Sequence, residues 1–597
     1  MLTVVGSGPG AAAVEAGLAD REAEIATDIE TVDRARLAVV VGPAGDDVFE
    51  RANERALAGE TPWIAVEHGG LGGLPVVDAA VTCFAPGQGC YNCLQARVRA
   101  NHGDETGMGD ETGMGDETGM GDETGVDDET GVDDKTGVGG EVGSGGRTDR
   151  ATERLAGAVA GHEAVRRLDG AEVAGRVVVV PYTEHPFLPV PGCDCGSTAD
   201  REVRRAYTDR PLGAALDRAE RALDDLVGVV QEVGEAESFP VPYYLATLSE
   251  TAGFSDATAA RNAAGVDPDW NRAFMKGLGE ALERYCAGVY RADSFLQGTP
   301  DTVESAVDPA AFVCKEQPAG ESIRWVPGVE LESNQAVALP AAFVPHPPPE
   351  QRYRPAVTTG LGFGNSGVEA LLSGLYEVVE RDAAMLAWYS SFDPLALSVE
   401  TDRVETMRSR AASEGLSVTL LLLTMDVDVP VVTAALHREE WPQFATGMAA
   451  DLDARAAGAS ALAEALQNWM ELRGMGPERA AAASGAIGRY ADLPGAASSF
   501  IDTGATVDAG DISTEVSDGG AELDAVLGRL AAADLTAYAA RTTTRDVATL
   551  GFEAVRVLVP AAQPLAFGEM YFGERAETVP VSLGFEPRLD REHHPFP

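Results

Sequence analysis

Lysine is nearly absent from this 597-residue chain. Lys135, Lys276 and Lys315 are its only lysines, and 45 basic residues face 95 acidic ones, which gives a net charge of −50. A basic patch that holds nucleic acid cannot be built on this composition, so a nucleic-acid partner is excluded. The acidic residues run along the whole chain, which indicates a halophilic protein whose self-repulsion is screened by salt. The alternative is that the acidic residues bind a basic partner.

Long apolar runs are also missing. No uninterrupted apolar stretch reaches the roughly 18 residues that are needed to span a membrane. The first residues, MLTVVGSGPG, include no basic segment of the kind that opens a secretory signal. These absences exclude a membrane-spanning protein and predict a cytoplasmic one.

Cysteine is scarce as well, but four of the seven cysteines form two close pairs. The pairs are Cys90-Tyr-Asn-Cys93 and Cys193-Asp-Cys195. Paired cysteines in a cytosolic protein are more often metal ligands than disulfides. Four soft thiolates suit tetrahedral Zn²⁺, and a closed set of four leaves no open position for catalysis, so we expect a structural zinc. Unrelated cysteines, with or without redox chemistry, are the alternative.

The first hundred residues alternate strand-like and helix-like segments. LTVVG and LAVVVGP read as strands, whereas AAAVEAGLADREAEI and DDVFERANERALAG read as helices. This alternation predicts an α/β domain with a parallel sheet. The length of the whole chain predicts two to four domains.

A six-residue repeat interrupts this first domain. GDETGM occurs three times and is followed by GDETGV, DDETGV and DDKTGV. Because the repeat has no apolar face to bury, we expect residues 101–147 to be a disordered, solvated linker that folding does not require. A calcium-binding acidic repeat is the alternative.

The remaining segments divide as follows. Residues 148–168 are predicted to form a helix with Thr148 as its cap, and the first domain is expected to resume over 148–198 after its first part, 1–100. Residues 199–235 read as a charged helical connection. A large α/β (α+β) region follows over 236–597, and a start as early as residue 215 is left open.

The cysteine segments resemble a known domain. PGQGCYNCLQAR, AGAVAGHEAVRRL and HPFLPVPGCDCG are similar to the zinc-bearing end of ThiF-like domains, relatives of ubiquitin-activating enzymes that occur in thiazole/oxazole peptide biosynthesis. Gly6-Ser-Gly8-Pro-Gly10 stands where a Rossmann-like domain has its dinucleotide loop. The resemblance implies a docking domain with a zinc knuckle, bound by Cys90, Cys93, Cys193 and Cys195.

Three apolar segments carry glutamates at helical spacing. Glu280 and Glu283 share one helix face because residues three apart are neighbours. Glu369, Glu380 and Glu377 fall at roughly 0°, 20° and 80° around another helix, on one side of it. Two such helices that face each other would form a cage of carboxylates for Mg²⁺, which takes oxygen ligands and bridges to phosphates. The alternative is that these glutamates lie on solvent-exposed helix faces, because the E-x-x-E pattern arises often by chance in so acidic a chain.

These segments resemble the YcaO family over roughly residues 215–597. The matching motifs are GLGEALERY, GNSGVEALLSGLYEVVERDA, ALAEALQ and the final HPFP. The resemblance implies that Mg²⁺ and ATP phosphates are bound by Glu280, Glu283, Glu377 and Glu380. It implies nucleotide contacts for Asn365 and Glu369, a phosphate contact for Arg381, and a place near the site for Gln467. The carboxylate of Pro597 would act in catalysis as a proton acceptor.

The same resemblance implies a function and partners. Family members spend ATP to phosphorylate the oxygen of a peptide backbone amide, and SagD-like members thereby cyclise Cys, Ser or Thr residues to azolines. The fused ThiF-like domain favours this reaction over thioamidation with external sulfide, and a non-catalytic peptide-binding scaffold is a third alternative. The implied partners are a ribosomal precursor peptide, a leader-peptide-binding protein, a downstream dehydrogenase and a second copy of the chain.

One departure from the family pattern concerns a lysine. Many family members carry a glycine–lysine–glycine segment before the first glutamate helix, whereas this chain reads Asn262-Ala-Ala-Gly265-Val266 there. The sequence leaves open which residue takes the place of that lysine.

Overall fold

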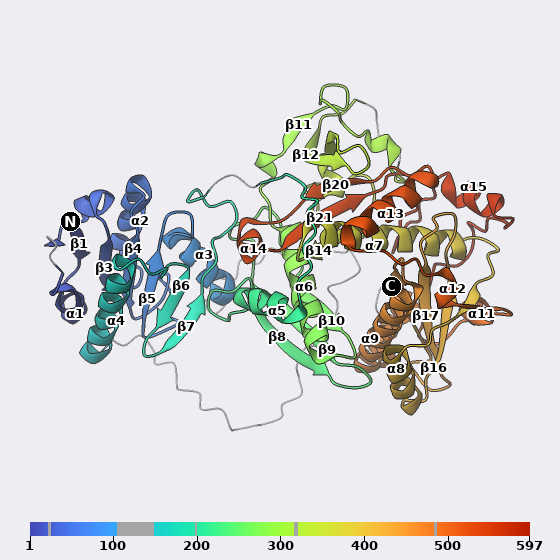
Figure 1. The fold of residues 1–597 in the computed structure, drawn as a ribbon, viewed down its shortest axis with the longest axis horizontal. Coiled ribbons are helices and arrows are strands. Elements are labelled where there is room, and N and C mark those ends of the chain that lie inside the picture. The colour runs from blue at the N-terminus through green and yellow to red at the C-terminus, as the bar shows by residue number, and fades with distance from the viewer. Residues whose placement is uncertain (22–24, 104–148, 197–199, 316–319, 483–485) are drawn as a thin grey trace.

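The computed structural model describes residues 1–21, 25–103, 149–196, 200–315, 320–482 and 486–597 (Figure 1). The acidic repeat and the expected cap Thr148 lie outside these residues. A smaller N-terminal α/β unit, blue to cyan in Figure 1, stands beside a larger unit that contains three further sheets. The expected α/β (α+β) class is confirmed. Within the described residues, no helix combines the length and the apolarity that crossing a membrane requires.

The N-terminal unit is built on one seven-stranded sheet in the order β2-β1-β3-β4-β5-β6-β7. Its strands are β1 (Leu2–Val5), β2 (Ile25–Ala26), β3 (Ala38–Pro43), β4 (Trp63–His68), β5 (Ala79–Phe84), β6 (Arg176–Val179) and β7 (Thr183–Pro186). The first four are parallel, but β4 to β7 pair antiparallel. The expectation of a purely parallel sheet is therefore wrong, because no crossover helix stands between β4 and β5 or between β6 and β7.

Helices cover both faces of this sheet. Helices α1 (Pro9–Leu18) and α4 (Arg150–Leu168) pack on one face over Val39 and Val41 of β3. Helices α2 (Asp47–Gly59) and α3 (Tyr91–His102) pack on the other face over Val40. Neighbouring strand residues thus point to opposite cores, as the pleat requires.

Glycines let α1 and α4 approach closely. A Cβ atom on Gly157 of α4 would stand 2.1 Å from the carbonyl oxygen of Gly10, so only glycine fits there. Helix α4 begins at Arg150 and is capped by Asp149, whose carboxylate accepts hydrogen bonds from the backbone N–H groups of Ala151 and Thr152.

The connection expected to be helical over 199–235 is helical only in part. Residues 200–211 form neither helix nor strand, and they lead into α5 (Leu212–Ala219), the 3₁₀ turn η3 (Glu220–Ala222) and β8 (Val230–Glu237). Ion pairs and a proline override the helical tendency of this charged segment, since Pro211 stands directly before α5.

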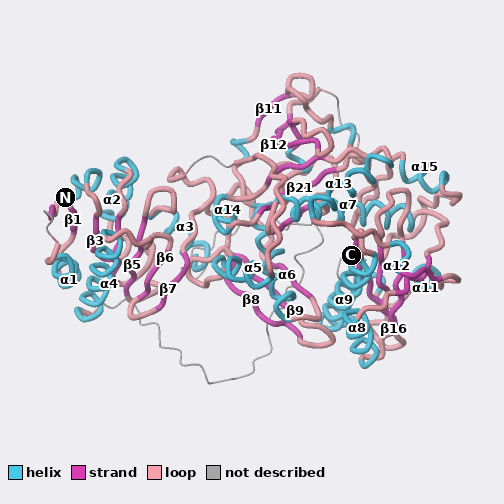
Figure 2. Tube along the Cα trace, viewed as in Figure 1, coloured by secondary structure: helices cyan, strands magenta, loops and turns pink. Residues whose placement is uncertain are grey.

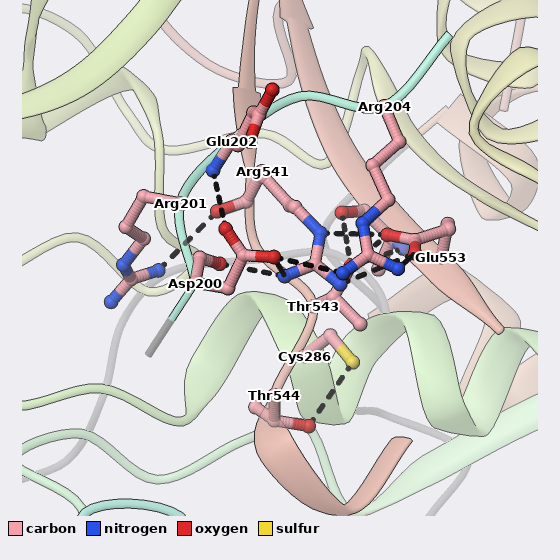
Figure 3. A network of polar contacts seen from close by, with 10 residues as sticks. Asp200, Arg201, Glu202, Arg204, Cys286, Arg541, Thr543, Thr544 and Glu553 are labelled. Atoms are coloured by element: carbon pink, nitrogen blue, oxygen red, sulfur yellow. Dashed lines mark hydrogen bonds and ion pairs between the residues drawn. The ribbon is translucent and has the colours of Figure 1, made fainter. Parts of the chain in front are cut away.

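Figure 3 shows how residues 200–204 are held. The carbonyl oxygen of Asp200 accepts a hydrogen bond of 2.6 Å from Arg541, which also donates to both oxygens of Glu553 at 2.7 and 3.2 Å. Arg204 adds an ion pair of 3.1 Å to Glu553. The connection is therefore fixed on strands β20 (Tyr538–Arg541) and β21 (Glu553–Leu558) of the larger unit.

The larger unit contains three sheets. The first has the antiparallel order β10-β9-β8, with β9 (Tyr243–Leu248) and β10 (Asn262–Val266). The second has the order β11-β12-β20-β21-β14, and β13 pairs with β12; its strands are β11 (Leu296–Gly298), β12 (Ile323–Glu330), β13 (Ala336–Pro340), β14 (Leu361–Gly364), β20 (Tyr538–Arg541) and β21 (Glu553–Leu558). The third has the order β18-β17-β16-β15-β19, with β15 (Leu395–Ser398), β16 (Ser417–Leu422), β17 (Val431–His437), β18 (Phe444–Ala450) and β19 (Thr506–Asp508).

Three long helices connect these sheets. Helix α6 (Trp270–Gly288) packs on β9, β10 and β14, α7 (Gly367–Trp388) packs on β14, β21 and β18, and α9 (Ala454–Ala482) packs on β17 and β18. Figure 2 shows the helices in cyan between the magenta strands. The shorter helices are α8 (Asp402–Ser413), α10 (Ala486–Tyr490), α11 (Gly495–Ile501), α12 (Ala509–Ile512), α13 (Gly519–Ala532), α14 (Arg545–Leu550) and α15 (Arg575–Ser582).

Candidate functional site

The two cysteine pairs meet in space. Cys90 stands at the N-cap of α3 and Cys93 in its first turn, while Cys193 and Cys195 follow β7. The Sγ atoms of Cys90 and Cys93 are 3.8 Å apart, those of Cys90 and Cys193 3.6 Å, and those of Cys93 and Cys195 3.5 Å. All four sulfur atoms lie within 4.8 Å of one another.

This spacing fits a tetrahedral metal. Thiolates about 2.3 Å from a central Zn²⁺ stand about 3.8 Å from one another. The other three cysteines, Cys83, Cys286 and Cys314, are not members of the cluster. The four clustered residues could therefore hold one Zn²⁺ in a closed site.

A second group with metal-binding side chains lies between the two units. The Nδ1 atom of His185 on β7 is 2.7 Å from a carboxylate oxygen of Asp224, and Asp225 stands beside them. Asp224 also accepts hydrogen bonds from the backbone N–H groups of Leu226 and Val227. Its carboxylate raises the pKa of His185, which is the expected result of an ion pair across the unit boundary.

Helix α6 presents Glu280 and Glu283. One oxygen of Glu280 accepts a hydrogen bond of 2.9 Å from the backbone N–H of Ala264 on β10, and the other lies 3.0 Å from Arg284. Burial raises the pKa of Glu283 to about 8; Arg284 opposes this shift, and the charges of Glu377 and Glu280 add to it. The α6 carboxylates thus lie close enough to the α7 carboxylates to repel them.

Helix α7 presents Glu377 and Glu380 around Arg381. Glu377 accepts a hydrogen bond of 2.8 Å from the backbone N–H of Gly360, and the Arg381 guanidinium lies 3.7 Å from Glu377 and 3.2 Å from Glu380. Burial raises the pKa of Glu380 to about 8, Arg381 opposes this shift, and Glu464 and Glu377 add to it. Two glutamates therefore share one guanidinium.

Helix α9 adds a carboxylate that the sequence analysis did not assign to the site. Glu464 accepts a hydrogen bond of 2.6 Å from the backbone N–H of Met448, and burial raises its pKa to about 7 while Arg381 opposes the shift. Gln467, one turn further along, donates to Glu471 at 3.0 Å, and Glu471 also accepts from the Tyr243 hydroxyl. The signal for Glu464 was its place three residues before Gln467 on the same helix face.

The start of α7 holds a polar group of its own. Asn365 donates to one oxygen of Glu369 through its backbone N–H at 2.8 Å and through its side-chain amide at 3.0 Å. Arg218 of α5 donates to the Asn365 side chain at 2.5 Å and to the Gly551 carbonyl at 2.7 Å. No local pattern marks Arg218, because it lies 147 residues from Asn365 in the chain.

The glutamates stand in an open arrangement, and the cage expected from the sequence stays a prediction for the Mg²⁺-bound protein. Within the described ranges, no three of these carboxylates bring an oxygen atom each within 4.8 Å of one another. Helices α6 and α7 both pack against strand β14. Mg²⁺ typically takes one or two carboxylates together with substrate phosphates, so an open arrangement of oxygen donors suits Mg²⁺ bound with a triphosphate.

The last residues of the chain reach this group. Arg381 donates to the terminal oxygen of Pro597 at 2.5 Å, and the Thr446 hydroxyl donates to the Pro595 carbonyl at 2.9 Å. The Phe596 side chain is fully buried against Trp388 and Phe500. The tail is therefore anchored, and Arg381 connects it directly to Glu377 and Glu380.

A lysine lies at the end of β10 although the strand itself has none. Lys276, one turn before Glu280 on α6, donates to the Val266 carbonyl at 3.0 Å and lies 3.2 Å from Asp267. The Lys276 side chain is 44% exposed. An ammonium group is thus supplied from the helix, next to the segment where the sequence analysis found no lysine.

Comparison with known proteins gives matches over the whole chain and over its C-terminal part. A family model described as YcaO cyclodehydratase, ATP- and Mg²⁺-binding, matches residues 264–563. A heterocyclase solved in complex with substrate and cofactor is similar with a TM-score of 0.70 and 19% identity, over 98% of this chain and 83% of that one. The heterocyclase TruD is similar with a TM-score of 0.63 and 19% identity, over 98% and 82%.

A curated relative matches part of the chain. An uncharacterized protein of Methanothermobacter thermautotrophicus is 29% identical over 180 residues, which cover 29% of this chain and 46% of that protein. The match thus spans about half of the relative's length. The two heterocyclases share their fold with almost the entire chain, and the N-terminal unit fits a ThiF-like Rossmann fold.

Proposed function

The chain belongs to the YcaO family, and we propose that it spends ATP to activate a backbone amide of a ribosomal precursor peptide. The observation that carries this proposal is the meeting of Glu377 and Glu380 with Arg381 at the Pro597 end of the chain, where the charge of Glu283 also acts on Glu377. These groups come from segments far apart in sequence, and only the fold brings them together.

Each side chain has a proposed role. Glu280, Glu283, Glu377 and Glu380 would hold Mg²⁺, and Arg381 would contact the phosphates of ATP as a bidentate donor. Asn365 and Glu369 would hold the nucleotide at the start of α7, with Gln467 nearby on α9. When bound, Mg²⁺ neutralises charge on the triphosphate and on the departing phosphate. The raised pKa values of Glu283 and Glu380 support this assignment, because crowded carboxylates gain most from a cation.

The proposed reaction makes the amide oxygen a leaving group. A Cys thiol or a Ser or Thr hydroxyl of the peptide adds to the carbonyl carbon, and the oxyanion formed attacks the γ-phosphorus of ATP, which releases ADP. The nitrogen lone pair then expels phosphate, and loss of the N–H proton leaves an azoline. The nucleophile loses one proton in the first step, and in this proposal a terminal carboxylate oxygen of Pro597 accepts it.

The match to heterocyclases, which includes the N-terminal unit, favours ring formation over thioamidation. Two solved proteins with the same fold over nearly the whole chain are heterocyclases, one of them in complex with substrate and cofactor. A heterocyclase uses a nucleophile of the peptide itself, whereas thioamidation needs external sulfide. We therefore propose cyclodehydration as the reaction and thioamidation as the second candidate.

Mass spectrometry of the peptide product distinguishes the two reactions. Cyclodehydration removes one water, about 18 Da for each ring, whereas exchange of oxygen for sulfur adds about 16 Da. We expect losses of about 18 Da that require both ATP and Mg²⁺. A gain of about 16 Da with sulfide would establish thioamidation instead, and an unchanged peptide mass with intact ATP would favour a peptide-binding scaffold.

We also propose that the cysteine cluster holds one structural Zn²⁺. The purified protein is expected to contain about one zinc per chain, which Cys90→Ser or Cys193→Ser removes, because each variant takes away one of four thiolates. Cys314→Ser is the matched control, since Cys314 is partly buried but lies outside the cluster. Metal analysis by mass spectrometry checks this result, and a wild type without zinc would contradict it.

The partners and setting follow as further proposals. A leader-peptide-binding protein, a downstream dehydrogenase and a second copy of the chain are the proposed partners, in a cytoplasm rich in salt. The acidic composition supports the high-salt setting, because 95 acidic residues against 45 basic ones repel one another in dilute buffer. We place the end of the first domain near residue 198 and the start of the second between 215 and 236.

A further inference from the structure

One arginine of the N-terminal unit is completely buried against the larger unit. Arg97 lies on α3, four residues after Cys93, and its side chain is 0% exposed. Its guanidinium forms an ion pair with Asp546 of α14, whose side chain is also 0% exposed. The same nitrogen atom of Arg97 donates to the Pro189 carbonyl at 3.2 Å. An ion pair this deeply buried persists only when its geometry is fixed on both sides.

The same contact includes the first glutamate helix. Tyr285 of α6 is fully buried, and its hydroxyl donates to the Asp546 carboxylate at 2.6 Å and lies 3.2 Å from Arg97. Tyr285 follows Glu283 by two residues. Figure 3 shows the neighbouring contact, in which Cys286 of α6 lies 3.5 Å from the Thr544 hydroxyl. Arg97, Asp546 and Tyr285, here called the junction triad, thus connect α3 to α6.

The cysteine cluster is joined to the same place. Arg545, next to Asp546, donates to the Cys195 sulfur at 3.5 Å and to the Gly87 carbonyl at 2.8 Å. A Cβ atom on Gly196 would stand 1.9 Å from the Arg545 guanidinium, so the Arg545 side chain would have to move if another residue stood there. Helix α14 therefore contacts the cysteine cluster through one residue and the glutamate helix through the next.

Glu283 depends on this support. No hydrogen bond or ion pair within 4.0 Å holds its carboxylate in the part of the chain that the structure describes, unlike Glu280, Glu377 and Glu380. Its position therefore follows from the placement of α6 alone. That helix is fixed near Glu283 by the buried Tyr285 hydroxyl.

We propose that the junction triad positions Glu283 for Mg²⁺, so that the cysteine cluster of the N-terminal unit controls nucleotide binding in the other unit. Arg97, Asp546 and Tyr285 are positioning residues in this proposal, since none of them is placed to touch the nucleotide. The proposal rests on the proposed function, because it assigns Glu283 to Mg²⁺·ATP.

The test uses Tyr285→Phe, which removes one hydroxyl group and keeps the ring. We expect the dissociation constant of Mg²⁺·ATP, measured by calorimetry on the full chain, to rise about 10-fold, as for other groups that orient metal ligands. Tyr290→Phe is the matched control: Tyr290 is also buried and its hydroxyl also donates a hydrogen bond, at 3.0 Å, but the acceptor is the Pro347 carbonyl and not a member of the junction triad. The control is expected to bind Mg²⁺·ATP as the wild type does.

A second variant tests the connection to the cluster. Cys195→Ser alone is expected to raise the dissociation constant of Mg²⁺·ATP. When it is introduced into the Tyr285→Phe variant, it is expected to raise that constant by less than about a further twofold, because the effects of coupled residues are not additive. Wild-type affinity in Tyr285→Phe, whatever its melting temperature, would overturn the junction triad. If the two substitutions changed the free energy of Mg²⁺·ATP binding additively, the proposed role of the cysteine cluster would be overturned. A wild type that binds no Mg²⁺·ATP would instead refute the proposed function itself.

Discussion

Glu380→Gln is expected to lower ATP turnover by at least about 100-fold while the protein stays folded, because the variant removes a charge that Mg²⁺ needs. Glu380 is buried beside Arg381 and contacts no other cation within 4.0 Å among the described residues. The neutral amide keeps the size of the side chain, so the loss is electrostatic. Phosphate release at saturating ATP, with a melting curve for each protein, checks this result.

A matched variant distinguishes the loss of a site glutamate from the loss of any buried glutamate. Glu67→Gln changes a glutamate that is also almost fully buried and whose pKa is raised by burial, but Glu67 lies on β4 in the N-terminal unit. We expect Glu67→Gln to retain ATP turnover within about twofold of the wild type once it is folded, because the hydrogen bonds of Glu67 go to Gly72, Gly73 and Tyr91 and not to the glutamate site or the junction triad. Equal losses in both variants would show that Glu380 acts through stability alone.

Phe596→Ala is expected to lower peptide modification more than about 10-fold and to leave Mg²⁺·ATP binding intact. The Phe596 ring fills a pocket against Trp388 and Phe500, and its loss frees the tail, so that Arg381 no longer holds Pro597. The glutamates keep their own contacts. The measurement compares the rate of peptide mass change with nucleotide affinity in the same preparation.

Phe585→Ala is the control for the tail. Phe585 belongs to the same C-terminal segment, but its ring packs against Phe392, with ring centroids 5.1 Å apart, and not against Trp388 or Phe500 as that of Phe596 does. We expect this variant to modify peptide at the wild-type rate. A Phe596→Ala protein with wild-type modification would show that the tail has no part in the reaction.

The sequence predicted which helices carry the glutamates, but it did not predict how those helices pack. The E-x-x-E-R spacing placed Glu280 and Glu283 on one face of α6, because helical neighbours depend on local geometry alone. The same spacing could not show that α6 and α7 both pack against β14, because that contact depends on the fold of the whole unit. Local pattern fixes which face a residue occupies, and tertiary packing decides what that face meets.

The contacts that could not be predicted from the sequence are mainly those between distant segments. Arg218 meets Asn365 across 147 residues, and the junction triad joins Arg97 to Asp546 across 449. A single arginine carries no periodic signal, so such partners become visible only in the fold. The prediction of a helical connection over 199–235 failed for a related reason. Its charged residues favour a helix locally, but in the fold they form ion pairs with Arg541 and Glu553 instead.

The central claim is that the amide oxygen of the peptide leaves as part of phosphate. A precursor peptide labelled with ¹⁸O in its backbone carbonyls tests this claim directly, because the oxyanion that attacks the γ-phosphorus carries the label with it. We predict that the phosphate released with ATP and Mg²⁺ contains one ¹⁸O atom for each ring formed. Unlabelled phosphate, with ¹⁸O retained in the peptide or lost to water, would contradict the proposal.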